Sequence, residues 1–397
     1  MKKSAISMAL ISLGFGSAMA QTQQFAPAAI KTESGIDFTP TLQAKLSHDN
    51  NLANTSADEI STWVLEVTPS LFMNYLEGAN QYNATVALAK GNHFSSSQDN
   101  YLDIFADANA LIELNQAHRF AINLNAVSGH ESRGTGVSEG LGRLPEEPVE
   151  FDTYSAKGHY EFGAMSTPAR IRLLAGYFDK EFSNFEQLTQ YRNYKTVSVG
   201  GMFFYDTQAT TRLVAEVTQD NIRYDLVDPT GNRDSDSRKY RVGLDWEATA
   251  LTSGTARIGY QQKDFTTNQR ADFSGVTWDA SVSYQPLSYT TFKVSTGREA
   301  KDPNVVGDYI KETRYGASWM HNWSEALSSS VGYNYSSEKY TGVAREDKVN
   351  SYSVAADYLL LTNVSLGLGV ALTDKDSTVA NIKFDKTVYY FTVRAGF

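Results

Sequence analysis

A two-residue alternation of apolar and polar side chains runs through almost the whole chain and constrains its fold more than any other feature. Between Tyr240 and Trp246, every second residue is apolar, and the residues between them are Arg241, Gly243 and Asp245. The same alternation covers residues 62–75, 314–319 and 364–372. Because successive side chains of a β-strand point to opposite faces, this period predicts strands with one apolar and one polar face. The chain is therefore predicted to be all-β.

Short connections alternate with longer polar ones along the chain. The short ones are residues 77–80, 115–118, 164–169, 206–209, 249–254, 286–289, 324–327 and 361–363. The long ones are residues 49–59, 91–99, 131–148, 183–194, 226–238, 266–275, 300–308, 341–348 and 374–382. Between them lie about eighteen segments of roughly ten residues, which is typical of bacterial transmembrane barrels with short periplasmic turns and long external loops. We expect a transmembrane antiparallel up-and-down β-barrel of about 18 strands.

The first twenty residues have the pattern of a secretory signal peptide. Lys2 and Lys3 precede an apolar stretch at 5–16, and Ala18-Met19-Ala20 is a small-residue cleavage site. We expect cleavage after Ala20 and export to the outer membrane. The predicted organisation is a signal peptide at 1–20, a short periplasmic segment at 21–35 and the outer-membrane barrel at 36–397. Outer-membrane lipid and lipopolysaccharide are then the expected surroundings.

Several other classes of protein are disfavoured. The chain has no cysteine and a formal net charge of −10, so a disulfide framework is excluded and a nucleic-acid partner is not expected. His130, Glu131 and Ser132 are adjacent, and neighbours on a strand point to opposite faces, so they make a poor hydrolase site. The acidic cluster of Asp228 and residues 234 and 236 lacks the spacing of a calcium loop. We expect no enzyme activity, no catalytic residue, no cofactor and no metal.

Aromatic residues gather near the predicted strand ends. Those toward the short connections are Tyr75, Phe162, Tyr205, Trp246, Tyr284, Trp323 and Phe397, and those toward the long loops are Phe94, Tyr101, Phe182, Tyr194, Tyr224, Phe265, Tyr309 and Tyr340. Aromatic rings favour the membrane–water boundary, so two lipid-facing girdles are expected.

The last predicted strand ends on an aromatic residue. Tyr389, Phe391, Val393 and Phe397 share one face of it. This ending resembles the C-terminal signal by which the outer-membrane assembly machinery recognises its barrels. The resemblance implies that the barrel assembly machinery is a partner.

The polar face of the strands is expected to line an aqueous lumen, because about eighteen strands enclose more space than side chains fill. Loop 131–148, with four glycines and mixed charge, is the best candidate for a constriction. The charged residues expected to face the lumen are Glu66, Asp103, Asp107, Arg119, Lys157, Arg172, Arg212, Glu216, Arg241, Asp245, Arg257, Asp279, Lys293, Arg314 and Arg394.

The opening strand and loop, residues 36–52, resemble the start of the β-barrel porin family, type two. The match rests on a short strand followed by the polar stretch His48-Asp49-Asn50-Asn51, and the general layout extends to Phe397. Some members resemble the barrel of exopolysaccharide or capsule export systems. That resemblance implies an export channel working with a periplasmic polysaccharide export protein. A general or substrate-selective diffusion porin and a surface or adhesion barrel are the alternatives.

Overall fold

The computed structural model describes residues 25–207, 210–249 and 251–397. The predicted signal peptide at 1–20 lies outside the described residues. No helix in the described part of the chain is long and apolar enough to span a membrane.

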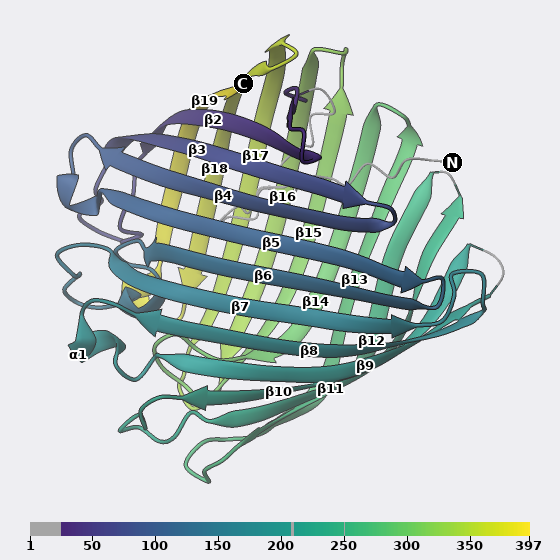
Figure 1. The fold of residues 1–397 in the computed structure, drawn as a ribbon. Helices are drawn as coiled ribbons and strands as arrows, with labels where there is room; N and C mark the ends of the chain where they lie inside the picture. The colour runs from purple at the N-terminus through teal and green to yellow at the C-terminus, as the bar shows by residue number, and fades with distance from the viewer. Residues whose placement is uncertain (1–24, 208–209, 250) are drawn as a thin grey trace.

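The described chain consists almost entirely of β-strands joined in sequence order (Figure 1). The first half contains β1 (Ile30–Lys31), β2 (Ile36–Asp49), β3 (Thr62–Glu77), β4 (Asn80–His93), β5 (Tyr101–Asn115), β6 (His118–Glu131), β7 (Val149–Phe162), β8 (Ala169–Phe182), β9 (Tyr194–Asp206) and β10 (Thr211–Tyr224). The second half contains β11 (Ser235–Thr249), β12 (Thr252–Phe265), β13 (Phe273–Leu287), β14 (Thr290–Lys301), β15 (Ile310–Asn322), β16 (Leu327–Tyr340), β17 (Glu346–Leu361), β18 (Val364–Ser377) and β19 (Phe384–Gly396).

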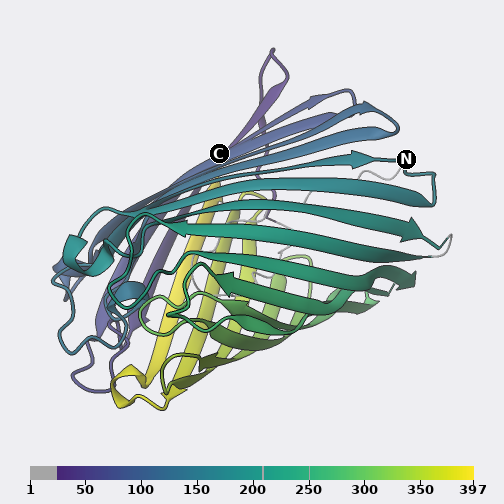
Figure 2. The same cartoon turned by 90° about the horizontal axis from the view of Figure 1, so that it is seen from below.

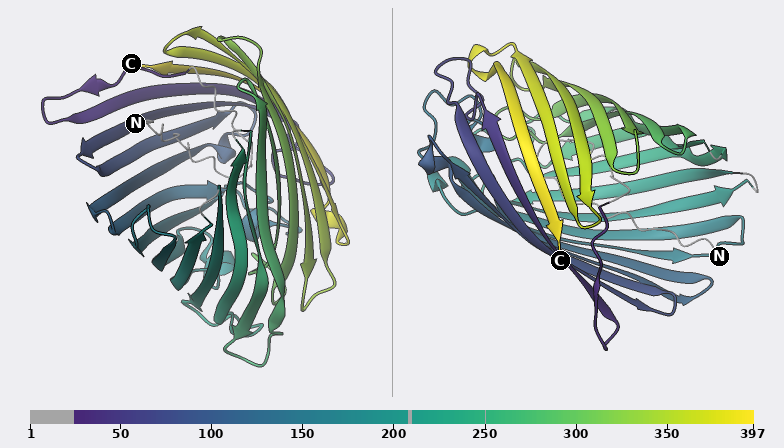
Figure 3. Two further views of the ribbon diagram at one scale, coloured as in Figure 1. Left: turned by 90° about the vertical axis from the view of Figure 1, so that its right-hand side faces the viewer. Right: turned by 90° about the horizontal axis from the view of Figure 1, so that it is seen from above.

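Strands β2 to β19 form a closed antiparallel barrel of eighteen strands, as the sequence predicts. Each strand pairs with the next, and β19 pairs with β2 from Val388↔Asp49 to Gly396↔Thr41. Figure 3 shows the closure, with the yellow β19 lying beside the purple β2. Closure leaves no unpaired barrel edge, which is the condition for strands to cross a lipid bilayer.

The two ends of the barrel are built differently. Short turns lie at one end, here named the short-turn end, and the longer loops lie at the other, the long-loop end (Figure 2). The tightest turns have two residues between strands, as at 78–79, where Gly78 adopts a left-handed φ of +60°. The long loops hold one helical turn, α1 (Glu186–Thr189), and the 3₁₀ turns η1 (Ser97–Asp99), η2 (Gly136–Ser138) and η3 (Ala380–Ile382).

Apolar side chains cover the outer surface of the barrel. On neighbouring β11 and β12, Val242 is 60% exposed and Ile258 is 57% exposed. Arg241 and Arg257, which directly precede these two residues in the sequence, lie on the opposite face. In lipid this arrangement is favourable, because the outward apolar band meets hydrocarbon and the backbone is fully paired within the sheet.

The aromatic girdle at the short-turn end agrees with the prediction, but the one at the long-loop end does not. Phe162, Tyr205, Tyr284 and Trp323 are 44% to 58% exposed on the outer surface. Of the eight residues expected at the other boundary, Phe94 is 66% exposed, Phe265 and Tyr309 are buried, and the other five are half-buried. Two of them, Phe265 and Tyr309, pack with Phe273 and Ala300 in a buried cluster.

The reason for this error is strand parity. Phe265 lies an even number of residues from Arg257 and therefore shares its inward face. Likewise Tyr101 donates its hydroxyl to Glu66 at 2.5 Å, and the rings of Tyr194 and Tyr224 lie 5.3 Å apart. The long loops cover these rings, so the expected outer girdle is instead an aromatic layer inside the barrel wall.

The segment before the barrel turns back on itself. β1 pairs with β2 through Ile30↔Phe38 and Lys31↔Asp37, and Thr32 accepts a hydrogen bond from Gly35. The expected short N-terminal segment at 21–35 thus includes, in its described part, a small hairpin attached to the first barrel strand. The Phe397 amide donates to the carbonyl of Pro40, so the last residue stays fastened to β2.

Candidate functional site

The polar inner face of the barrel is the candidate site, and its charged residues are mostly joined in pairs. Asp103 lies 2.9 Å from His130, and Glu216 lies 2.6 Å from Arg241. Arg394 donates to the Gln43 side chain at 3.0 Å. Whether the fifteen predicted residues line a solute path stays a prediction.

Five arginines gather on this face at the short-turn end. Glu161 on β7 accepts from Arg119 and Arg172 at 2.6 Å each and from Arg170 at 3.3 Å. Phe204, which is only 2% exposed, lies under three guanidinium groups. Their carbons are 4.9 to 5.8 Å from its ring centre, a cation–π arrangement. The other ion pairs of these arginines are Arg170–Asp206, Arg212–Asp245 and Arg257–Asp245.

A second charged group lies on β11, β14 and β15. Glu299 accepts from Lys239 at 2.9 Å and from Arg314 at 3.2 Å. Arg314 also pairs with Glu312, which Lys301 reaches at 2.7 Å. Next to this group, Asp279 and Arg314 border a recess of about 220 Å³ in the wall. Alternating signs along the wall keep the local field mixed rather than strongly cationic or anionic.

The loop between β6 and β7, residues 132–148 and here named the crossing loop, reaches the opposite side of the long-loop end. Glu139 pairs with Arg345 at 2.6 Å and with Lys375 on β18, and the Gly140 carbonyl accepts from Asn381 at 2.5 Å. Five strands separate β6 from β18 along the shorter way round the barrel. Five intervening strands make six steps of about 4.8 Å, which is roughly 30 Å of wall, and the loop bridges this distance through Glu139.

The far attachment of the crossing loop is a compact ion network, here named the latch (Glu139, Arg345, Asp347 and Lys375). Asp347 is fully buried and accepts from Arg345 Nε at 3.0 Å and from Lys375 at 3.3 Å. Burial lowers the pKa of Arg345, but hydrogen bonds to Asp347 and Glu139 outweigh burial and raise that pKa above its usual value. Two carboxylates and two cations therefore share a water-poor site at the loop's far end.

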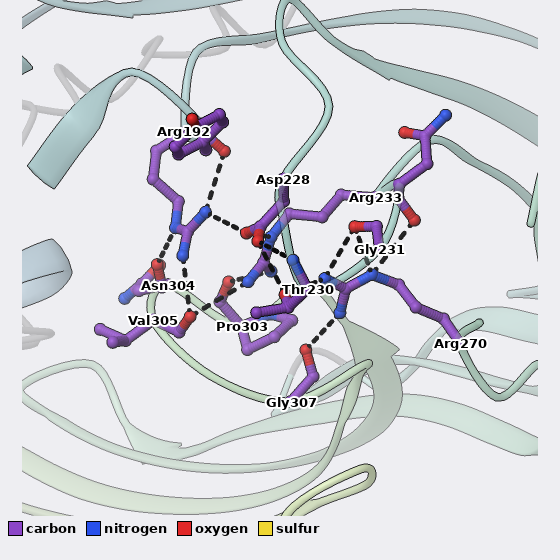
Figure 4. Close-up of polar contacts among 12 residues, drawn as sticks. Arg192, Asp228, Thr230, Gly231, Arg233, Arg270, Pro303, Asn304, Val305 and Gly307 are labelled. Atoms are coloured by element: carbon purple, nitrogen blue, oxygen red, sulfur yellow. Dashed lines mark hydrogen bonds and ion pairs between the residues drawn. The ribbon is translucent and has the colours of Figure 1, made fainter. Parts of the chain in front are cut away.

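Four other long loops meet in a second network, here named the arginine clamp (Arg192, Asp228, Arg233 and Arg270; Figure 4). Asp228 accepts from Arg192 at 2.7 Å and from Arg233 at 2.8 Å. The same two arginines donate to the carbonyl of Val305 at 2.9 and 3.0 Å. Arg270 donates to the carbonyls of residues 231 and 307 at 3.0 and 2.8 Å. Loops 183–193, 225–234, 266–272 and 302–309 are joined in this way.

The arginine clamp explains the role of Asp228 in the acidic cluster. Asp228 is 5% exposed and is bound by arginines, while Asp236 pairs with Arg223 at 2.7 Å and Asp234 accepts from a backbone amide. Burial raises the pKa of Asp228, but hydrogen bonds from Arg233 and Thr230 outweigh it and hold that pKa well below its usual value. Asp228 therefore serves as an anion that fastens loops.

The residues that shape the mouth are not predicted from the sequence. Glu139, Arg192, Arg233, Arg270, Arg345 and Lys375 lie in loops or at strand ends, where period two carries no information about contacts. The one available signal was the run of glycines in the crossing loop. Gly134 shows why they are needed, because it has a φ of +78° and a Cβ there would lie 1.8 Å from the Ala53 carbonyl oxygen.

The comparison with protein families decides the family. Residues 37–397 match the family model described as "Putative beta-barrel porin 2". The chain belongs to this family. Membership agrees with the resemblance seen in residues 36–52 and with the closed barrel, and it places the protein in the outer membrane. The family and the fold are those of channels rather than enzymes. No curated protein matches the chain.

Solved structures of Pseudomonas aeruginosa channels share the fold. OccK2 (OpdF) matches with a TM-score of 0.54 at 8% identity, covering 91% of this chain and 98% of that chain. OpdK solved with vanillate matches with a TM-score of 0.50 at 13% identity, covering 91% and 99%. OccK2 solved with glucuronate gives 0.53 at 8% identity, covering 91% and 98%. At these identities the likeness concerns the fold.

Proposed function

We propose that this porin-family barrel is a diffusion channel for small water-soluble solutes, with its short turns in the periplasm and its long loops outside. The observation that carries the proposal is the crossing loop, fastened through Glu139 to the opposite side of the mouth. A mouth divided by a pinned loop leaves passages for small solutes. The fifteen charged residues predicted for the lumen are proposed to line these passages, and cleavage after Ala20 is proposed to release the mature chain.

Diffusion of small solutes is preferred over polymer export as the proposed function. The resemblance in residues 36–52 favours export, whereas the family match and the solved structures support the porin alternative. An emerging polysaccharide would have to displace the crossing loop and break its contacts to Arg345 and Lys375. A surface or adhesion barrel has less support, because the long loops are tied to one another and turn inward over the lumen.

The inner wall supports passage of polar solutes without strong retention. Paired charges such as Glu216–Arg241 offer hydrogen bonds while leaving little uncompensated field. Two channels of similar fold were solved with small organic ligands, vanillate and glucuronate, which is compatible with a path of this kind.

A liposome-swelling assay with purified, refolded barrel tests the proposal. Vesicles containing the protein should swell in isotonic monosaccharide and disaccharide, and the rate should fall steeply for longer oligosaccharides because the crossing loop divides the mouth. Vesicles without protein give the background. Swelling no faster than background in monosaccharide would reject the diffusion function. Loss of surface polymer from a null mutant whose small-solute uptake is normal would restore the export reading.

A further inference from the structure

A cavity of about 510 Å³ lies against the inner wall, and it has the chemistry of a solute-binding site. Residues from eight consecutive strands, β4 to β11, line it. Its size falls within the roughly 300–1,000 Å³ typical of small-molecule pockets. It is separate from the arginine group at the short-turn end, since none of those five arginines lines it.

One side of the cavity is a ladder of asparagine amides. Asn109 donates to Asn83 at 3.1 Å, and Asn123 donates to Asn109 at 2.8 Å. Asp107 accepts from Asn123 at 2.9 Å and also from Asn109, which fixes the direction of the chain of hydrogen bonds. Held side chains lose little freedom on binding. Both N–H groups of Asn109 and of Asn123 are used within the ladder, so the ladder offers its Oδ1 atoms as acceptors for solute hydroxyl groups.

Lys157 continues the same row and supplies a charge. It is the cross-strand partner of Asn123 on one side and of Gly176 on the other. Its side chain is exposed in the cavity, and it forms no ion pair with any residue that the structure describes. Gly176 has no side chain to fill the space beside it.

The other charged groups of the cavity have partners. Glu216 pairs with Arg241 at 2.6 Å, and Lys239 pairs with Glu299 at 2.9 Å. Asp220 accepts from the Ser198 hydroxyl at 2.6 Å. The ammonium group of Lys157 is therefore the cation of this cavity left without an anionic partner in the described chain. An incoming anion would meet it beside the ladder.

We propose that the cavity is a binding subsite for an anionic, hydroxylated solute of sugar-acid size. Its carboxylate pairs with Lys157, and its hydroxyls donate to the Oδ1 atoms of Asn109 and Asn123. A neutral sugar lacks the charge for Lys157, and a small carboxylate such as acetate lacks the hydroxyls for the ladder. This subsite rests on the proposed diffusion function, for which it names a substrate class.

Single-channel recording in planar bilayers tests the subsite, with gluconate, glucose and acetate as probes. Gluconate should reduce the potassium chloride current of the wild type in a saturable way at millimolar concentration, whereas glucose and acetate should not. Lys157→Gln should weaken the gluconate effect roughly threefold to fivefold, the size expected for a solvated ionic contact. Asn109→Leu should also weaken it, because it removes the middle of the ladder.

Lys293→Gln is the matched control, because it removes the same charge from the same face on β14, outside the cavity. It should alter anion permeation in general and leave the gluconate midpoint within twofold of the wild type. An open wild-type channel that gluconate does not block, or equal shifts from both lysine variants, would overturn the subsite alone. A wild type without channels would overturn the diffusion function.

Discussion

The two ends of the barrel use the same kinds of side chain in different ways. At the short-turn end, aromatic rings such as Trp323 and Phe162 point outward, and the connections between strands are minimal. At the long-loop end, Phe265 and Tyr309 point inward beneath loops that salt bridges join to one another. Outward aromatics anchor a barrel in its membrane, whereas inward aromatics and buried ions give shape to a mouth. Position along the strand therefore decides what an aromatic residue does.

The difference extends to the ion pairs. The arginine clamp and the latch join loops that are far apart in sequence, with Glu139 and Lys375 separated by 236 positions. The ion pairs of Glu161 join β6, β7 and β8, which are already neighbours in the sheet. Removing an ion pair at the long-loop end should thus change the shape of the mouth, while the barrel itself should persist.

The largest effect is expected from Asp228→Ala. It leaves the half-buried Arg192 and the buried Arg233 close together without their shared carboxylate, and breaking a buried pair costs about 3–5 kcal/mol. The four clamped loops should open and be cut by external protease, while the heat-modifiable gel shift of the folded barrel is retained. Asp225→Ala, on the same loop but 38% exposed at its side chain, is the control. Equal protection in both variants would show that the clamp does not hold the loops.

The next effect is expected from Glu139→Gln. The amide weakens the contacts to Arg345 and Lys375, and the crossing loop should spend more time away from the far wall. Single-channel conductance should rise, and larger oligosaccharides should pass in the swelling assay. Glu146→Gln changes an 88% exposed carboxylate of the same loop and should leave both values at wild type. Unchanged conductance in Glu139→Gln would mean that the latch does not control the mouth.

A smaller effect on stability is expected at the other end from Phe397→Asp. A charge on the lipid face near the interface costs about 0–1 kcal/mol, so the folded barrel should remain stable. If the terminal aromatic is also an assembly signal, the amount of inserted barrel in cells should fall well beyond what that cost explains. Tyr205→Asp, at the same end, is the control for the general cost. Equal insertion of both variants would remove the case for a signal in Tyr389, Phe391, Val393 and Phe397.

The smallest effect is expected from mild acid. The folded-state pKa of Asp228 is depressed, so its stabilising contribution is present above the unfolded pKa of about 3.9 and is lost only as the pH falls through the lower folded value. Protease protection of the clamped loops should therefore be unchanged from pH 7 to about pH 4 and decline below that. If protection were lost near pH 5, a group other than Asp228 would hold the loops together.

The site shows where prediction from sequence ends. The two-residue period predicts that Arg212 on β10 and Asp245 on β11 both face inward. Their side chains lie 2.7 Å apart across this strand pair. The period could not reveal that Lys157 lacks an ionic partner or that Asn83, Asn109 and Asn123 form a ladder, because register across strands sets those contacts. The sequence places Asp228 in an acidic cluster, and only the folded loops show that Arg192 and Arg233 bind it.

The sequence by itself determined the all-β class, the strand count and the polar and apolar faces, because these follow from local alternation and from the spacing of turns. Only the tertiary structure decided what the long loops do. Glu139 meets Arg345 and Lys375 only after the eighteenth strand closes on the first and brings distant loops over one opening. Local patterns carry no trace of such contacts, since a loop's partner depends on the circumference of the barrel and not on its neighbours in the chain.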